Sequence, residues 1–462
     1  MEFGLGLTKF VAPLIFLSAF AVFFLTIFYR IEVGIFFLVP FIPLQNILNY
    51  ANAYPFGKDI NDLIILAMLI RWAIDARKRE KFFQSSPLKL LIIVFIFWTY
   101  IELWRGASYL GFPAPLSLTE SRVIAWKNFL MLPLLFFIVL NNIKTQKHVE
   151  ILLILMTLSM LSLDRNFYNA AAGRDFSEYT EWRFTGASGQ ALSGNALAVF
   201  QAQYSALLIF LFLSSKKAWH KALYGVTLIF NYYCLMFSFS RSGYLAAAVT
   251  LGFAGLVKDR RLLAALIIVA IFWKALLPLS VQQRIEMTKT EEGYDATVME
   301  RIGMWESAKT IISENPVAGA GFAVTRFLNI QVSGFQYTWA SFHSGYVETT
   351  VELGFLGLVL YLLFFLLGIH GGWKLYRVSD DELFKSLGLG FIGCVLGVLG
   401  GNIAGTYWNY MNVMGFYWVL LALVLRSTII AQEQLVTEKI TEPSAPIVWQ
   451  PFEHKPVEQP AA

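Results

Sequence analysis

Apolar runs recur along most of the chain, and this repetition constrains the fold more than any other feature of the sequence. A helix that crosses a bilayer needs about 20 mostly apolar residues. Hydropathy indicates about thirteen such runs. They cover residues 10–28, 33–48, 60–74, 88–103, 123–140, 149–163, 192–213, 222–239, 244–257, 262–277, 346–369, 383–404 and 411–425. The chain is 57% hydrophobic and 15% charged, whereas a soluble domain has roughly 45–50% and 25%, so a single water-soluble globule is excluded.

The predicted fold class is therefore an all-α polytopic membrane protein with about 12 or 13 transmembrane helices. Pro40 and Pro43 interrupt the second run, which can instead be broken or re-entrant and would then leave about twelve spans. Residues 1–279 are expected to hold about nine or ten spans, residues 280–345 one large polar loop, and residues 346–426 three more spans. The polar, proline-containing tail, residues 427–462, is predicted to be a disordered cytoplasmic segment.

Basic residues in the short loops predict the orientation, because Lys and Arg accumulate on the cytoplasmic side. They cluster in residues 77–81, 144–147, 216–221, 258–261 and 374–377, and these loops share one side if every run spans. The large polar loop then lies on the opposite side. The first run lacks a small-residue cleavage site and continues into further apolar sequence, so it is not expected to be a cleaved signal.

Charge and cysteine content narrow the range of partners. The net charge of +5 is modest for a chain of 462 residues, and nucleic acid is not an expected partner. Both cysteines, Cys234 and Cys394, lie within apolar runs, so their spacing supports neither a disulfide framework nor a metal site. No metal or cofactor is predicted.

The polar loop contains the clearest local pattern. Apolar residues at three- and four-residue spacing predict an amphipathic helix over about residues 295–313, with Asp295 as its cap. The stripe is Val298, Ile302, Trp305, Ala308 and Ile312. Asn315-Pro316 is expected to end the helix. Gly319 and Gly321 follow, and they would let the backbone approach a ligand closely.

Charged and titratable residues gather around this loop. Arg241 lies at the mouth of two apolar runs, Arg301 lies on the predicted helix, and His343 immediately precedes the next span. Glu348 and Glu352, four residues apart, share a face of that span and need polar surroundings. Alone, each arginine is an ordinary membrane anchor and the histidine an inert loop residue. Together, two arginine forks can bind a pyrophosphate and a neutral histidine can take a proton from an attacking hydroxyl.

Several short motifs resemble the O-antigen ligase and polymerase superfamily of bacterial membrane glycosyltransferases. Ser240-Arg241-Ser-Gly243 heads a predicted helix, and Arg301 and Trp305 precede Pro316 and Gly319-Ala-Gly321. His343 is followed by Glu352-Leu-Gly354-Phe-Leu-Gly357, and Gly186 is followed by Asn195-Ala-Leu-Ala198. The resemblance covers roughly residues 186–358. One departure is Ser344, where many members have Asn after the histidine.

The resemblance implies a metal-independent, inverting transfer of a glycan from undecaprenyl pyrophosphate at the periplasmic face of the bacterial inner membrane. It assigns pyrophosphate binding to Arg241 and Arg301 and the proposed base to His343. Glu348, Glu352, Gly319 and Gly321 are further candidates for substrate binding. The acceptor can be lipid A–core (a ligase), a growing glycan (a polymerase) or a protein Ser or Thr side chain, with membrane lipids as surroundings.

A transporter of anionic solutes is the alternative from another class, in which the same arginines would form a selectivity site. A transport pathway should carry charged groups at mid-span, and the candidates instead cluster at one interface. No internal repeat or matching pair of broken segments is visible either. Gly393, Gly397, Gly401 and Gly405 recur every fourth residue, and this stripe predicts close helix packing.

Overall fold

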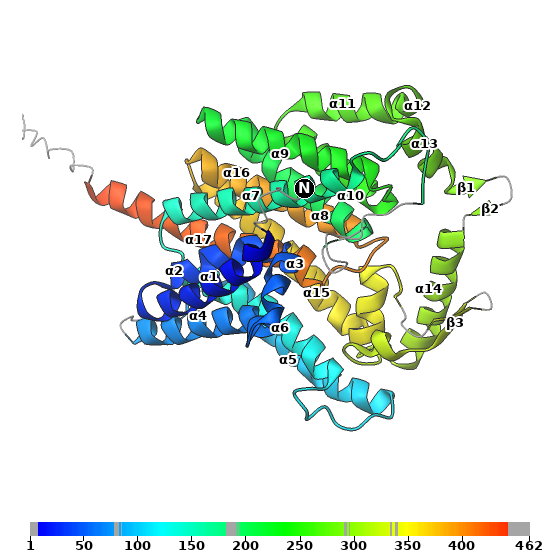
Figure 1. Ribbon diagram of the computed structural model, residues 1–462, viewed down its shortest axis with the longest axis horizontal. Helices are drawn as coiled ribbons and strands as arrows, with labels where there is room; N and C mark the ends of the chain where they lie inside the picture. The colour runs from blue at the N-terminus through cyan, green and yellow to red at the C-terminus, as the bar shows by residue number, and fades with distance from the viewer. Residues whose placement is uncertain are drawn as a thin grey trace, which may run out of the picture.

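A bundle of helices dominates the structure, with two short β-hairpins in the large loop (Figure 1). The computed structural model describes residues 8–77, 83–84, 86–181, 192, 194–290, 293–294, 296–332, 335–337 and 341–441. The all-α, multi-pass membrane class predicted from hydropathy is confirmed.

The elements before the large loop are α1 (Thr8–Phe28), α2 (Ile31–Phe41), α3 (Gln45–Leu48), η1 (Asn49–Ala53), η2 (Gly57–Asp59), α4 (Ile60–Ala76), α5 (Pro87–Tyr109), α6 (Ser121–Asn142), α7 (Gln146–Ala171), α8 (Gly194–Ser214), α9 (Ala218–Phe237), α10 (Arg241–Val257), α11 (Arg260–Ile271) and α12 (Trp273–Leu276). The loop contains α13 (Leu279–Glu286), β1 (Lys289–Thr290), β2 (Gly293–Tyr294), α14 (Ala296–Glu314), η3 (Val324–Phe327), β3 (Ile330–Val332) and β4 (Phe335–Tyr337). The three helices predicted after it are α15 (Gly345–Val378), α16 (Glu382–Gly401) and α17 (Met411–Thr441).

Among the described residues, fewer helices are long and apolar enough to cross a membrane than the twelve or thirteen spans predicted. Within the described residues, eight helices are long and apolar enough to cross a membrane, or nine if the bent pair of α2 with α3 and η1 counts as one. That pair bends by 108° at the break before Gln45, so the run containing Pro40 and Pro43 is indeed broken. Other predicted spans are too short or too polar to be counted. Helices α4 and α10 have 17 residues and α11 has 12. Helix α9 contains polar residues such as Lys221 and Asn231, which lower its mean hydropathy.

The predicted disorder of the tail is wrong for residues 427–441. These residues continue α17 as helix to Thr441, because apolar side chains such as Ile430 and Ala431 still pack against the bundle. Residues 442–462 and the predicted cap Asp295 lie outside the described residues, as does Gly186. The predicted helix is present as α14, which ends directly before Asn315-Pro316. The predicted apolar stripe is only partly correct, because Trp305 is 40% exposed and Met304, which lies outside the stripe, is buried beside Ala308.

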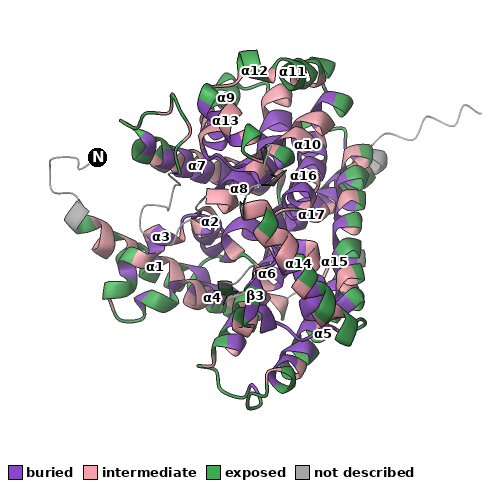
Figure 2. Ribbon diagram, turned by 90° about the vertical axis from the view of Figure 1, so that its right-hand side faces the viewer, coloured by how far each residue is buried: buried purple, intermediate pink, exposed green. Residues whose placement is uncertain are grey.

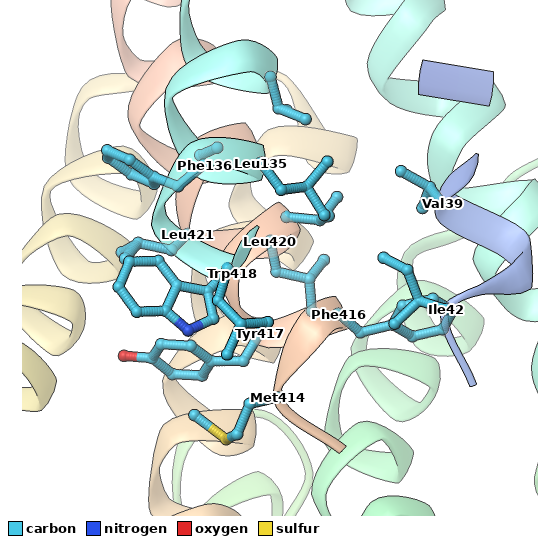
Figure 3. Packing of buried hydrophobic residues seen from close by; sticks show 14 of the residues in the cluster. Val39, Ile42, Leu135, Phe136, Met414, Phe416, Tyr417, Trp418, Leu420 and Leu421 are labelled. Carbon is cyan, nitrogen blue, oxygen red and sulfur yellow. The ribbon is translucent and has the colours of Figure 1, made fainter. Parts of the chain in front are cut away.

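The core lies around α8, α16 and α17, which are the most buried spans, while α1 and α11 are largely exposed at the periphery (Figure 2). Figure 3 shows Phe416 of α17 extending toward Ile42, directly after α2, while Tyr417 and Trp418 point to the other side. The Trp418 ring meets Phe136 of α6 and Phe364 of α15, and the Tyr417 ring meets Phe391 of α16. The glycine stripe of α16 faces α8: a Cβ at Gly393 would meet the Cβ of Ala206 at 2.5 Å. The predicted close packing is therefore present, although Gly405 lies beyond the end of α16.

Candidate functional site

A polar cavity of about 310 Å³ brings together three residues that the sequence singled out, Arg241, Arg301 and His343. Its walls come from the starts of α8 and α10, from α13 and α14, and from the segment before α15. The complete lining is Asn195, Arg241, Ser242, Arg284, Thr297, Glu300, Arg301 and His343. Residues about 150 positions apart in the chain thus share one small chamber, as the clustering argument requires.

A tight turn between α9 and α10 presents Arg241. Phe239 occupies the left-handed region with φ 53°, and Ser240 caps α10 by accepting a hydrogen bond from the Gly243 N–H at 3.3 Å. Arg241 is the first residue of the helix. Its Nη1 donates to Thr288 Oγ1 at 3.0 Å and its Nη2 to Thr297 Oγ1 at 3.2 Å. Two neutral hydroxyls therefore help to orient the guanidinium.

Helix α14 carries Arg301 and also holds the loop of His343. Met304 and Ala308 of α14 pack against Phe342 and the start of α15, and Trp305 Nε1 donates to the Phe342 carbonyl at 2.8 Å. Trp305 lies four residues after Arg301, so both side chains leave the same side of the helix. The arginine and the histidine are therefore positioned by one rigid element.

His343 itself has the electrostatics of a base rather than of a cation. Burial lowers the pKa of its imidazole below the ordinary value, the positive charge of Arg301 lowers it further, and Glu300 opposes both effects. The ring is consequently neutral at pH 7. Its backbone is strained, with φ 50°, a conformation that non-glycine residues adopt rarely and often at functional sites.

Arg284 is a cavity residue that the sequence reasoning missed. It projects from the short helix α13, is only 6% exposed, and donates from Nε to the Phe239 carbonyl at 3.2 Å. Its guanidinium also lies over the ring of Tyr179, 5.3 Å from the centroid. No motif or periodicity marks it in the sequence. Thr297, beside Val298 of the predicted stripe, and Glu300, beside Arg301, are likewise cavity residues that the sequence does not distinguish.

The two glutamates of α15 are buried beside other polar groups and do not line this cavity. Glu348 and Glu352 are 8% and 1% exposed, and among the described residues that line the cavity neither appears. Glu352 Oε1 accepts a hydrogen bond from Thr325 Oγ1 at 2.6 Å, which ties α15 to η3. The sequence predicted that these two carboxyl groups need polar surroundings, and the hydrogen bond to Thr325 agrees with that prediction for Glu352. Substrate binding by the two glutamates stays a prediction.

Gly319 and Gly321 form a turn that packs against the protein's own backbone. Both have positive φ, and the Gly321 N–H donates to the Glu352 carbonyl at 2.9 Å. A Cβ at Gly319 would overlap the α15 backbone beside the break at Gly354, and one at Gly321 would overlap Gly106 of α5. The close approach that these glycines permit is thus to α5 and α15, and a role in substrate binding stays a prediction.

Metal chemistry has no obvious ligand set here. In the part of the chain that the structure describes, no three or more His, Cys, Asp or Glu side chains come close enough to hold a metal ion.

Comparison with known proteins identifies this region. Residues 226–362 match the O-antigen ligase family, and the match runs from α9 into α15. It includes Arg241, Arg284, Arg301 and His343, and therefore every charged residue of the cavity. No curated protein sequence matches the chain.

Proposed function

We propose that the protein transfers a glycan from undecaprenyl pyrophosphate to an acceptor hydroxyl at the periplasmic face of the bacterial inner membrane; the match of residues 226–362 to the O-antigen ligase family supports this proposal. The observation that carries it is one polar cavity in which two predicted phosphate-binding arginines meet a histidine whose pKa is lowered by burial and by Arg301. The two arginines suit a diphosphate, and the histidine suits an attacking hydroxyl that must lose its proton.

The residues divide the chemistry between them. Arg241 and Arg301 bind the pyrophosphate of the donor and stabilise the charge that grows on it as the glycosidic C–O bond breaks. His343 takes the proton of the acceptor hydroxyl, whose oxygen forms the new bond to the anomeric carbon. Attack from the side opposite the leaving group inverts that carbon. The products are the glycosylated acceptor and undecaprenyl pyrophosphate, and the histidine returns its proton to solvent.

The position of the cavity supports the periplasmic orientation. Helix α8 begins with Asn195 in the cavity wall and ends at Ser214, next to Lys216 and Lys217 in a second, mixed-charge cavity. A helix of 21 residues is about 30 Å long, so the two cavities lie roughly a bilayer apart. Since basic loops favour the cytoplasm, the arginine cavity belongs on the opposite side.

Single substitutions in purified protein, assayed with an undecaprenyl-pyrophosphate-linked glycan and an acceptor, test these roles. Arg241→Ala and Arg301→Ala should abolish transfer while the protein still inserts into the membrane. Lys309→Ala, which removes an exposed cation from the same helix as Arg301, is the control and should transfer normally. Full transfer by either arginine variant would rule out the pyrophosphate role.

The histidine is tested separately. His343→Ala should lower kcat by about 10²–10⁴-fold if the imidazole is a general base. An unchanged rate would show that His343 takes no proton. His370→Ala, in the exposed part of α15, serves as the matched control.

The acceptor is decided by what accumulates in a deletion strain. Undecaprenyl-linked full-length polymer, with none on lipopolysaccharide, identifies a ligase that uses lipid A–core. Accumulated single repeat units identify a polymerase. Loss of glycan from exported proteins alone identifies a protein O-oligosaccharyltransferase.

A further inference from the structure

We propose that Arg284 is a positioning residue that holds Arg241 in the cavity by fixing the turn that precedes α10. This inference rests on the proposed role of Arg241 in binding pyrophosphate and adds a residue to which that role had not been assigned. It concerns a third arginine of the cavity, which donates to the Phe239 carbonyl and lies over the ring of Tyr179.

The contacts of Arg284 converge on Phe239, two residues before Arg241. Arg284 Nε donates to the Phe239 carbonyl at 3.2 Å, and the guanidinium lies over Tyr179. The Tyr179 ring in turn meets the Phe239 ring edge to face, with centroids 5.3 Å apart. The Tyr179 N–H donates to Gln283 Oε1 at 2.6 Å, so α13 holds this tyrosine as well as the turn.

The turn needs such support because it is strained and buried. Phe239 is 1% exposed and has φ 53°, which a large side chain adopts only when its surroundings enforce it. Ser238 pairs the backbone groups on either side of Phe239. Its Oγ donates a hydrogen bond to the Leu235 carbonyl at 2.7 Å and accepts one from the Ser240 N–H at 3.3 Å. The Phe239 carbonyl depends instead on Arg284.

Loss of this contact changes the start of α10. Without this donor, the buried Phe239 carbonyl would carry the free-energy cost of an unpaired acceptor. Rotating the carbonyl toward water would remove that cost, and the backbone of Phe239 would then leave the left-handed region. Arg241 follows directly in the chain, so its guanidinium would leave the Thr288 and Thr297 hydroxyls that orient it. Arg284 thus acts on pyrophosphate through Arg241.

A double-mutant cycle separates positioning from direct binding of the ligand by Arg284. The probe is inorganic pyrophosphate, titrated calorimetrically into the full-length protein in lipid nanodiscs. Arg284→Ala should weaken pyrophosphate binding about ten- to a hundredfold. In the Arg241→Ala background the same change should have almost no further effect. Equal losses in both backgrounds, or no loss in Arg284→Ala, would overturn the proposal.

A second variant leaves every charge in the cavity in place and covers the case in which Arg284→Ala does not fold. Tyr179→Leu removes the ring beneath Arg284 together with its edge-to-face contact with Phe239, and it should weaken pyrophosphate binding by about threefold or more. Binding equal to that of the unmodified protein would count against positioning. The control is Lys274→Ala, which removes a cation paired with Glu286 at the exposed side of α13 and should bind normally.

The same titration distinguishes failure of this inference from failure of the proposed function. If Arg241→Ala binds pyrophosphate as tightly as the unmodified protein, the role of Arg241 in the proposed function is wrong, and the inference falls with it. If Arg241→Ala binds weakly and Arg284→Ala does not, only the inference is overturned.

Discussion

Replacing Trp305 by Phe removes one N–H group and should slow transfer without unfolding the protein. In the structure, that group donates to the Phe342 carbonyl at 2.8 Å, and Phe342 is fully buried beside the strained His343. The phenyl ring keeps most of the packing of the indole. The substitution therefore isolates the hydrogen bond that holds the histidine loop against α14.

The size of the effect follows from the burial of the acceptor. Leaving a buried carbonyl without its donor costs about 1–3 kcal/mol. The left-handed backbone of His343 stores a similar amount, of order 1–3 kcal/mol, which is released when the loop relaxes. The active arrangement then loses about 1–3 kcal/mol relative to the relaxed one, and kcat should fall about 5- to 150-fold. Pyrophosphate affinity should not change, because Arg301 stays on α14.

The assay compares initial rates of transfer and pyrophosphate affinity in Trp305→Phe, with thermal unfolding as a check on stability. Trp126→Phe is the matched control, because it removes a Trp N–H that donates to Thr99 Oγ1 at 3.2 Å between α5 and α6. That bond is remote from the cavity residues. A normal kcat in Trp305→Phe, or an equal loss in Trp126→Phe, would refute the reasoning.

Two further predictions concern pH and backbone strain. Since burial and Arg301 lower the pKa of His343, kcat/KM should stay constant as the pH falls through 6.5 and should decline only at more acidic pH. Glu300→Gln removes the negative charge that raises the pKa of His343, so the decline in kcat/KM should move to still lower pH. Glu306 is exposed on the same helix, and Glu306→Gln should leave the pH of the decline unchanged. Both results are read from pH–rate profiles. Gly354→Ala should destabilise the protein by about 1–3 kcal/mol, because a Cβ there would overlap the neighbouring turn. Gly111→Ala has a similar φ, 66°, but open space around it, so equal losses of Tm in the two variants would exclude the overlap as the cause.

The sequence predicted the three central residues of the cavity for a physical reason. Arg241 begins α10 and His343 lies just before α15, and hydropathy predicts both helices as spans. When spans alternate across the bilayer, these two helix starts fall on one side, and Arg301 of α14 lies in the loop between them. Helix α14 could be placed because its apolar spacing and the Asn315-Pro316 stop are both local signals.

Arg284 and the glycine turn could not be predicted in the same way. The contact of Arg284 depends on the left-handed conformation of Phe239, which lies 45 positions earlier in the chain and has no signature in its own sequence. Gly319 and Gly321 carry a signal for close approach, but that signal is the same whether a ligand or a backbone approaches. Only the packed structure shows that α5 and α15 are the partners.

The shared dependence on α14 has a consequence for how the site works. Arg301, proposed to bind the leaving group, and Trp305, which fixes the loop of the proposed base, are one helical turn apart. Helix geometry sets the position of Arg301 relative to Trp305. A motion of a loop or a hairpin therefore cannot shift one of these residues without shifting the other. Met304 and Ala308 anchor this helix to Val351 of α15, which is a membrane span. Arg241 also donates to Thr297 of α14 at 3.2 Å, so a movement of α14 that opens the cavity to a bulky glycan would displace Arg301 and Trp305 as a unit and break this contact with Arg241.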